Sequence, residues 1–241
     1  EVLAAKNADA SIYPASMTKV MTALLVLEAN PDLDTPVTLP EDIFPELRAE
    51  GASMAGFLPG ETATARDLLY GALLPSGAEC CETLAREVSG SEEAFVASMN
   101  QKAAALGMAS THFCNPTGLH DPEHVSTARD MAVLLRAAMQ NEMFRTIFAT
   151  ARYTVPPTNL HPDGFTMEST FWSELDGTEL RRGKFLGGKT GYTSAAGLCL
   201  ASAAEVKGKT YLMVTAGAQG NHNTEPYHVD DAVNVCRQLA R

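Results

Sequence analysis

The sequence predicts a mixed α/β fold of the α+β type, with antiparallel strands towards its C-terminal end and a helical region in the middle of the chain. Two strand-like runs, 198–204 and 210–218, flank a short segment with the composition of a hairpin turn, 206–209. Helix caps and helical periodicity recur between about residues 31 and 149. No repeat, low-complexity tract or long charged run divides the 241 residues, so we predict a single domain spanning 1–241.

The first predicted element is a helix over 17–29. Apolar residues recur at helical spacing from Val20 to Leu27, and the segment is apolar almost all round. This pattern is typical of a helix buried in the body of a domain. Asn30-Pro31 is predicted to end the helix.

Ser16 and Lys19 lie three residues apart at the start of this helix, directly after Tyr13-Pro14-Ala15. Residues at this spacing share one helix face, so the hydroxyl and the amine can meet within hydrogen-bond reach. Apolar surroundings would desolvate the lysine and lower its pKa, and the neutral amine could then accept the serine proton. The helix N-terminus would stabilise an anion at Ser16. The alternative is an ordinary first-turn serine beside a lysine that extends to solvent, because Ser-x-x-Lys is frequent by chance.

Four further helices are indicated along the chain. A helical pattern covers 78–88. Ser91 opens a helix that Gly107 closes, and Thr127 opens another, with an acidic residue three positions on. A closing helix is predicted over 229–239.

A second motif, Lys189-Thr190-Gly191, lies in the glycine-rich segment 185–193, directly before the predicted hairpin. Glycines allow a ligand to approach the backbone closely. We predict that this segment is a strand beside the hairpin, which presents a cation, a hydroxyl and free backbone groups to a cleft. The alternative is a glycine-rich loop that precedes a strand.

Taken together, Ser-x-x-Lys at 16–19 and Lys-Thr-Gly at 189–191 form the signature of penicillin-binding proteins and class A β-lactamases. Other segments resemble one branch, the low-molecular-mass penicillin-binding proteins, which are serine D-alanyl-D-alanine carboxypeptidases. These segments are Lys6-Asn7-Ala8-Asp9, 90–95, Leu106-Gly107-Met108, Thr111-His112-Phe113, 115–119 and 126–131. The resemblance runs from about Val2 to the C-terminus. It implies the serine β-lactamase/penicillin-binding-protein-like fold, with Ser16 facing Lys189 across a cleft.

The resemblance implies a role for each motif residue. Ser16 would be the acylated nucleophile, and Lys19 its general base. Lys189 and Thr190 would face the terminal carboxylate of the substrate, and Lys189 would also depress the pKa of Lys19 by like-charge repulsion. The backbone N–H groups of Ser16 and Tyr192 would form the oxyanion hole. The implied substrate-binding residues are Lys189, Thr190, Gly191 and Tyr192.

The sequence departs from the family at the middle motif, usually Ser-x-Asn, because Ser76-Gly77-Ala78 carries an alanine where the amide is expected. Ser76 could still relay a proton between the leaving amine and Lys19. Either Glu79 or another segment would replace the lost amide, or substrate binding would be weaker. The alternative for Ser76 is a helix N-cap.

The resemblance also implies the partners and the location. The substrate would be a peptidoglycan stem peptide ending in D-Ala-D-Ala, and β-lactams would be covalent inhibitors that acylate Ser16. Neither a cofactor nor a metal is expected. The family is exported, so we expect a signal peptide and one leading strand upstream of Glu1, the strand pairing with residues 2–4. Contact with the membrane surface would depend on segments absent from this sequence.

Composition narrows the possible partners further. The net charge is −11 and the isoelectric point about 5.0, so nucleic acid is not an expected partner. No run approaches the roughly 18 apolar residues of a spanning helix.

The five cysteines are odd in number, and the adjacent Cys80 and Cys81 cannot easily bond each other. We therefore expect structural thiols, and no Cys-x-x-Cys pair suggests a zinc site.

A zinc hydrolase is the rival chemistry, because His120-Asp121-x-x-His124 is a local histidine pair. This pair follows the turn-rich segment 115–118, so helical His-Glu-x-x-His spacing is not expected. The histidines are predicted to lie in a loop and face solvent.

Two rivals share the fold. A serine β-lactamase needs a base that drives water onto the acyl-enzyme, yet Glu168, Glu174 and Glu179 are not in a Glu-x-x-Leu-Asn setting. Slow deacylation and a long-lived penicilloyl-enzyme are therefore predicted. With Ala78 in place of the amide, a catalytically weakened peptidoglycan-binding module is the non-enzymatic alternative.

Overall fold

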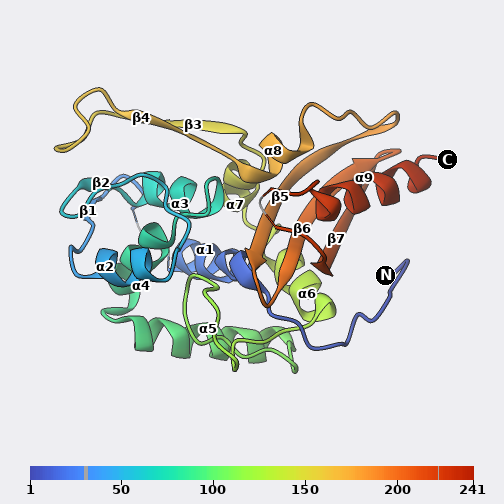
Figure 1. Ribbon diagram of the computed structural model, residues 1–241, viewed down its shortest axis with the longest axis horizontal. Helices are drawn as coiled ribbons and strands as arrows, with labels where there is room; N and C mark the ends of the chain where they lie inside the picture. Colours follow the sequence, from blue (N-terminus) through green and yellow to red (C-terminus); the bar gives the residue numbers. More distant parts are fainter. Residues whose placement is uncertain (30–31, 222) are drawn as a thin grey trace.

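The computed structural model describes residues 1–29, 32–221 and 223–241. A helical part adjoins a three-stranded sheet with its own covering helices (Figure 1). The helical part contains η1 (Ala15–Thr18), α1 (Lys19–Glu28), α2 (Ile43–Ala49), α3 (Ala65–Leu73), α4 (Ala78–Ser89), α5 (Glu92–Leu106), α6 (Ala128–Ala138) and α7 (Glu142–Phe148). Two small ribbons, β1 (Pro36–Thr38) with β2 (Thr62–Thr64) and β3 (Arg152–Val155) with β4 (Phe165–Glu168), flank it. The predicted helix stop at Asn30–Pro31 lies outside the described residues.

The sheet has the order β5-β6-β7, and its strands are antiparallel. The strands are β5 (Gly183–Thr193), β6 (Gly197–Val206) and β7 (Lys209–Ala218). Lys207 and Gly208 join β6 to β7 with φ angles of 51° and 73°. A two-residue loop with both φ angles positive matches the right-handed twist of the strands it joins. The predicted hairpin and the strand at Lys189-Thr190-Gly191 are therefore confirmed.

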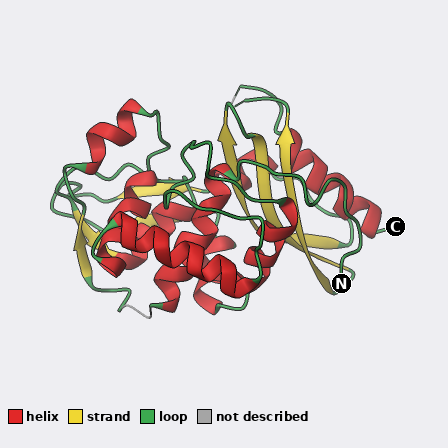
Figure 2. Ribbon diagram, turned by 90° about the horizontal axis from the view of Figure 1, so that it is seen from below, coloured by secondary structure: helices red, strands yellow, loops and turns green. Residues whose placement is uncertain are grey.

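The sheet separates two apolar cores. Cys199, Ala201 and Ala203 of β6 belong to the larger core, which is shared with the helical part. Leu200 and Ala204 point to the other face, where α8 (Thr170–Leu175) and α9 (Tyr227–Leu239) cover the sheet. In Figure 2 α9 is the helix that ends at the C-terminus, beside the strands of the sheet. Successive strand residues face opposite sides, so one strand supplies both cores. The sheet is thus buried on both faces, with helices on each.

The caps predicted for the central helices are present. Ser91 accepts a hydrogen bond from the Ala94 backbone N–H at 3.2 Å, and Gly107 ends α5 with a φ of 78°. Thr127 accepts from the Asp130 N–H at 3.0 Å at the start of α6. These side chains satisfy backbone donors that the first helical turn leaves unpaired.

The N-terminal segment differs from the prediction. Residues 2–4 are not a strand, and the side chains of Val2 and Leu3 are exposed. They form no ladder with any strand in the described part of the chain, and their pairing with a strand upstream of Glu1 stays a prediction. The helix that follows Pro14 begins as a tight 3-10 turn and becomes α-helical only at Lys19.

Candidate active site

Ser16 and Lys19 meet at the start of α1. The Lys19 Nζ lies 2.9 Å from the Ser16 Oγ, and the lysine is fully inside the protein while the serine is half-buried. Ser16 belongs to the 3-10 turn, which has three residues per turn, so side chains three apart lie almost in line. Ala15, directly before the serine, has a φ of 46°, a conformation that L-residues rarely adopt. The turn geometry thus brings the hydroxyl and the amine together.

A loop far along the chain holds the same amine. Lys19 Nζ donates to the Thr117 carbonyl oxygen at 2.6 Å. The Asn115 side chain folds this loop, because its Oδ1 accepts from the backbone N–H of Thr117 at 3.2 Å and of Gly118 at 2.8 Å. Sequence reasoning did not find Thr117, since the contact is made by a backbone carbonyl that no side-chain pattern reveals.

Ser76 and Lys189 form a second hydroxyl–amine pair. Lys189 Nζ donates to the Ser76 Oγ at 2.9 Å and to the Thr190 carbonyl oxygen at 2.9 Å. Ser76 lies in the turn between α3 and α4 with a φ of 70°. The N-cap alternative for Ser76 is wrong, because Gly77 occupies the cap position of α4 and the serine hydroxyl turns to β5 instead.

Burial shifts the pKa of both lysines. Desolvation lowers the pKa of Lys19, and nearby Cys81 and Glu79 offset part of that effect. The pKa of Lys189 lies well below its usual value, first because the side chain is buried and then because Lys19 repels its positive charge. The like-charge effect expected between the two amines is thus found at Lys189, whereas burial is the main cause at Lys19.

Strand β5 passes directly beside the nucleophile candidate. A Cβ built on Gly191 would lie 3.0 Å from the Ser16 backbone nitrogen and 3.2 Å from the Met17 nitrogen. A side chain here would crowd the nucleophile turn, and glycine lets the two backbones approach closely. On the same strand the Thr190 hydroxyl lies 2.6 Å from the hydroxyl of Thr170 in α8, a residue that sequence reasoning missed.

These elements enclose a cleft of about 450 Å³. The residues that line it are Ser16, Lys19, Glu50, Gly51, Ala52, Ser53, Ala78, Thr117, Gly118, Leu119, His120, Tyr192, Thr193, Ser194 and Ala195. Ser16 from η1, Lys19 from α1, Ala78 from α4 and Tyr192 from β5 thus face one space. Such a concave site with a few convergent polar groups is the usual form of a small-ligand site.

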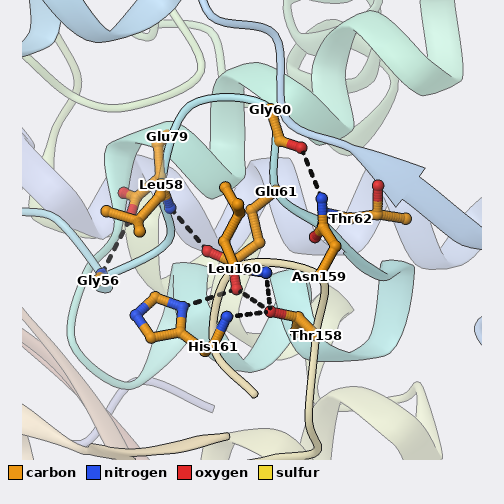
Figure 3. Close-up of polar contacts among 10 residues, drawn as sticks. All are labelled: Gly56, Leu58, Gly60, Glu61, Thr62, Glu79, Thr158, Asn159, Leu160 and His161. Carbon is orange, nitrogen blue, oxygen red and sulfur yellow. Dashed lines mark hydrogen bonds and ion pairs between the residues drawn. The ribbon is translucent and has the colours of Figure 1, made fainter.

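Glu79, the first residue considered as a replacement for the missing amide, does not face this cleft. It is buried, and its Oε1 accepts from the backbone N–H groups of Ala55 at 2.7 Å and Gly56 at 3.1 Å (Figure 3). Burial raises the pKa of this carboxyl, although the N–H donors of the loop oppose the shift. Glu79 therefore supports the loop next to the cleft, and the hypothesis that it replaces the amide is wrong.

A second buried carboxylate holds the far end of that loop. Glu61 accepts from the Leu58 N–H at 2.8 Å and from the Thr158 hydroxyl at 2.6 Å, and the His161 Nδ1 lies 2.8 Å from it. Figure 3 shows these contacts between the loop before β2 and the loop that joins β3 to β4. The segment 55–58 is thus fixed from both sides.

His120 and His124, the pair considered for a zinc site, have different surroundings. His124 is buried, with Nε2 at 2.8 Å from the Thr18 hydroxyl and Nδ1 accepting from the Cys114 N–H at 3.1 Å. Burial lowers the pKa of His124 to about 4. The expectation that this histidine faces solvent is wrong, whereas His120 is exposed and packs edge-on against Tyr13. Protein groups already occupy both ring nitrogens of His124.

All five cysteines are free thiols, and Cys80 and Cys81 are buried in α4. Among the residues that the structure describes, no group of three or more His, Cys, Asp and Glu side chains is arranged to hold a metal ion. Within the described ranges, no helix combines the length and the apolar character that a membrane crossing requires.

Comparisons with known proteins all match peptidases that act on D-alanyl-D-alanine, as their names state. A family described as D-alanyl-D-alanine carboxypeptidase matches residues 1–220. A D-alanyl-D-alanine carboxypeptidase of Bacillus subtilis is 37% identical over 229 residues, which cover 90% of this chain and 54% of the relative. The chain thus spans about half the length of that protein. A D-alanyl-D-alanine endopeptidase of Pseudomonas aeruginosa is 32% identical over 243 residues, covering 99% of this chain and 73% of the relative.

Solved structures are similar over the whole chain. A variant of the Streptomyces K15 DD-transpeptidase has a TM-score of 0.88 at 30% identity, covering 99% of this chain and 92% of that one. A D-alanyl-D-alanine carboxypeptidase from Mycobacterium tuberculosis has a TM-score of 0.84 at 32% identity, covering 100% of this chain and 87% of that one.

Proposed function

The chain belongs to the D-alanyl-D-alanine carboxypeptidase family of serine peptidases, and from this premise we propose that it removes the terminal D-alanine from peptidoglycan stem peptides through an acyl-serine intermediate. Its fold is that of the penicillin-binding proteins and serine β-lactamases, as the similar solved structures show. Members of the family act in the cell envelope, and we place the substrate of this chain there.

The observation that carries the proposal is the 2.9 Å contact between Lys19 Nζ and Ser16 Oγ at the edge of the cleft. Burial lowers the pKa of the amine, which favours its neutral form. A neutral amine at this distance can accept the serine proton while the Thr117 carbonyl oxygen accepts an N–H and holds the nitrogen in place. This contact supports the assignment of Ser16 as the nucleophile and Lys19 as its base.

The proposed reaction has two steps. Ser16 Oγ forms a bond to the carbonyl carbon of the penultimate D-alanine and gives its proton to Lys19. The C–N bond to the terminal D-alanine then breaks, and the leaving amine receives that proton through the Ser76 hydroxyl. In the second step water cleaves the ester and releases the shortened peptide, which restores Ser16.

Strand β5 supplies the groups that recognise the substrate in this proposal. Lys189 and Thr190 face the terminal carboxylate, and the backbone N–H groups of Ser16 and Tyr192 stabilise the oxyanion. The close approach of Gly191 to the Ser16 nitrogen supports this assignment, because it places the β5 backbone against the nucleophile turn. Preorganised donors of this kind usually contribute the largest single part of the rate enhancement.

Slow deacylation is proposed for β-lactams, which mimic the D-Ala-D-Ala end. Glu174 lies 3.0 Å from the His228 Nε2, and Glu168 pairs with Arg152 at 3.1 Å. Both carboxylates thus already have partners outside the cleft. We therefore expect a long-lived penicilloyl-enzyme rather than the rapid turnover of a β-lactamase.

The first experiment incubates the purified protein with a fluorescent penicillin and measures its intact mass. A stoichiometric adduct that Ser16→Ala abolishes and Ser11→Ala keeps supports the acyl-serine chemistry. Ser11 is an exposed serine five residues upstream and serves as the matched control. Release of D-alanine from a pentapeptide then tests the substrate, and continuous loss of nitrocefin colour would favour a β-lactamase. No adduct in the folded parent protein would favour the peptidoglycan-binding module.

A further inference from the structure

Thr170, the first residue of α8, contacts both the turn before Ser76 and strand β5. Its backbone N–H donates to the Leu74 carbonyl oxygen at 3.1 Å, two residues before Ser76. Its hydroxyl lies 2.6 Å from the hydroxyl of Thr190 on β5. Thr170 therefore contacts the turn that carries one proposed proton-relay group and the strand that carries the proposed carboxylate site.

The two hydroxyls form a closed pair. Among the described residues, neither hydroxyl has another hydrogen-bond partner. A hydroxyl has one proton to donate and two lone pairs that accept. In a pair, the hydroxyl that accepts keeps its own proton free for a third group.

We propose that Thr170 is a positioning residue, whose hydroxyl donates to Thr190 so that the Thr190 hydroxyl donates to the terminal carboxylate of the substrate. The inference rests on the proposed function, which gives Thr190 that carboxylate as its ligand. A carboxylate only accepts hydrogen bonds, so its arrival fixes the direction of the chain from Thr170 through Thr190 to the ligand. Each bond in such a chain polarises the next, and a bond to an anion is stronger than one between neutral groups.

Packing holds the donor in place. Thr190 is buried and Thr170 half-buried, and the ring of Phe171, the next residue of α8, fills the space beside Gly188 on β5. A Cβ on Gly188 would lie 2.5 Å from that ring. Helix α8 and β5 are therefore in tight contact, and the hydroxyl of Thr170 cannot move far from Thr190.

The test compares benzylpenicillin with its methyl ester, which lacks the charged carboxylate. Second-order rates of Ser16 acylation are measured by competition with a fluorescent penicillin. The parent protein should react faster with the acid than with the ester. Thr170→Val should slow the acid about fivefold, in the range of one hydrogen bond, and leave the ester unchanged. Thr170→Ser, which keeps the hydroxyl, should restore the parent rates.

Two controls separate positioning from general damage. Thr154→Val removes a similar threonine pair on the exposed β3–β4 ribbon, 2.9 Å from Thr166, and should change neither rate. In a Thr190→Val background, Thr170→Val should have no further effect on the acid. Thermal unfolding is measured for every variant, and Thr170→Ala repeats the comparison if valine lowers the unfolding temperature.

The outcomes are distinct. A Thr170→Val protein that keeps the parent preference for the acid, or that slows acid and ester equally, overturns the inference while the proposed function stands. A parent protein that neither compound acylates overturns the proposed function and the inference with it.

Discussion

The Ser16–Lys19 pair and the Ser76–Lys189 pair have the same dimensions and different origins. In each, a buried lysine nitrogen lies 2.9 Å from a serine hydroxyl and also donates to a backbone carbonyl. The first pair is three residues apart within one turn, whereas 113 positions separate the second. Local backbone geometry builds one pair, and the approach of the α3–α4 turn to β5 builds the other. We therefore expect changes in either pair to have different consequences.

The largest effect is expected from Lys19→Gln. If Lys19 is the base, losing the amine should slow penicillin acylation by about 10³-fold, within the range measured for general-base removal. Lys184→Gln removes an exposed lysine of the same sheet and serves as the control. Acylation rates and thermal unfolding are measured together, and a folded Lys19→Gln protein that reacts at the parent rate would assign the base elsewhere.

A smaller effect is expected from Ser76→Ala, which leaves the Ser16–Lys19 contact in place. Loss of the proposed relay should slow D-alanine release by about 10²-fold, because protonation of the leaving amine then lacks its donor. Ser89→Ala is the matched control, because Ser89 ends α4, the helix that follows Ser76. Equal losses for Ser76→Ala and Lys19→Gln in a single-turnover assay would mean that the two pairs act as one unit.

The pH profile distinguishes the pairs further. Because burial lowers the pKa of Lys19, its neutral fraction rises with pH and levels off below the ordinary lysine value of 10.5. Below the lowered pKa of Lys19, the acylation rate should rise about tenfold per pH unit. Above that lowered pKa, the rate should reach a plateau. Lys189, Glu79 and Cys81 also act on this site electrostatically. If the acylation rate of Lys19→Gln still rises with pH in the same way, one of these other groups titrates instead of Lys19.

The smallest effect on rate is expected at Glu79, which supports the loop beside the second pair. Glu79→Ala leaves the Ala55 and Gly56 N–H groups without their acceptor and should cost about 2 kcal/mol of unfolding free energy. Glu79→Gln keeps the accepting oxygen and removes a carboxyl whose pKa burial raises, so its stability should equal or exceed that of the parent. Urea unfolding measures both variants, and equal losses for alanine and glutamine would contradict the role of the accepting oxygen. Acylation should slow only a few-fold in Glu79→Ala.

Much of the fold could be predicted from local patterns. The hairpin at Lys207-Gly208 and the caps at Ser91 and Thr127 depend on a few neighbouring residues, so their signals are complete within a short window. Residues 2–4, which are not a strand here, illustrate the opposite case. A strand exists only with a neighbour, and no local pattern supplies one.

Within the site, the Ser16–Lys19 contact could be predicted from the sequence, whereas the contacts of Thr170, Thr117 and Glu79 could not. Spacing alone indicated that Ser16 and Lys19 could meet, and the 3-10 turn brings them to 2.9 Å. The hydroxyl of Thr170 and the carbonyl of Thr117 were not found, because helix α8 and the loop at Thr117 reach their partners only through tertiary packing. The role considered for Glu79 was wrong for the same reason, because only the position of residues 55–56 shows which N–H groups its carboxylate contacts.

Local sequence was enough to predict that Ser16 and Lys19 can meet, where the β6–β7 hairpin turns and where the central helices are capped, because backbone dihedral angles fix the distance between residues a few positions apart. The meeting of Ser76 with Lys189 and of Thr170 with Thr190, and the burial that lowers the pKa of both lysines, follow from the three-dimensional packing instead. Contacts between different elements and the loss of water around a charge depend on how whole elements pack. That packing is a property of the assembled cores, which no short stretch of the chain encodes.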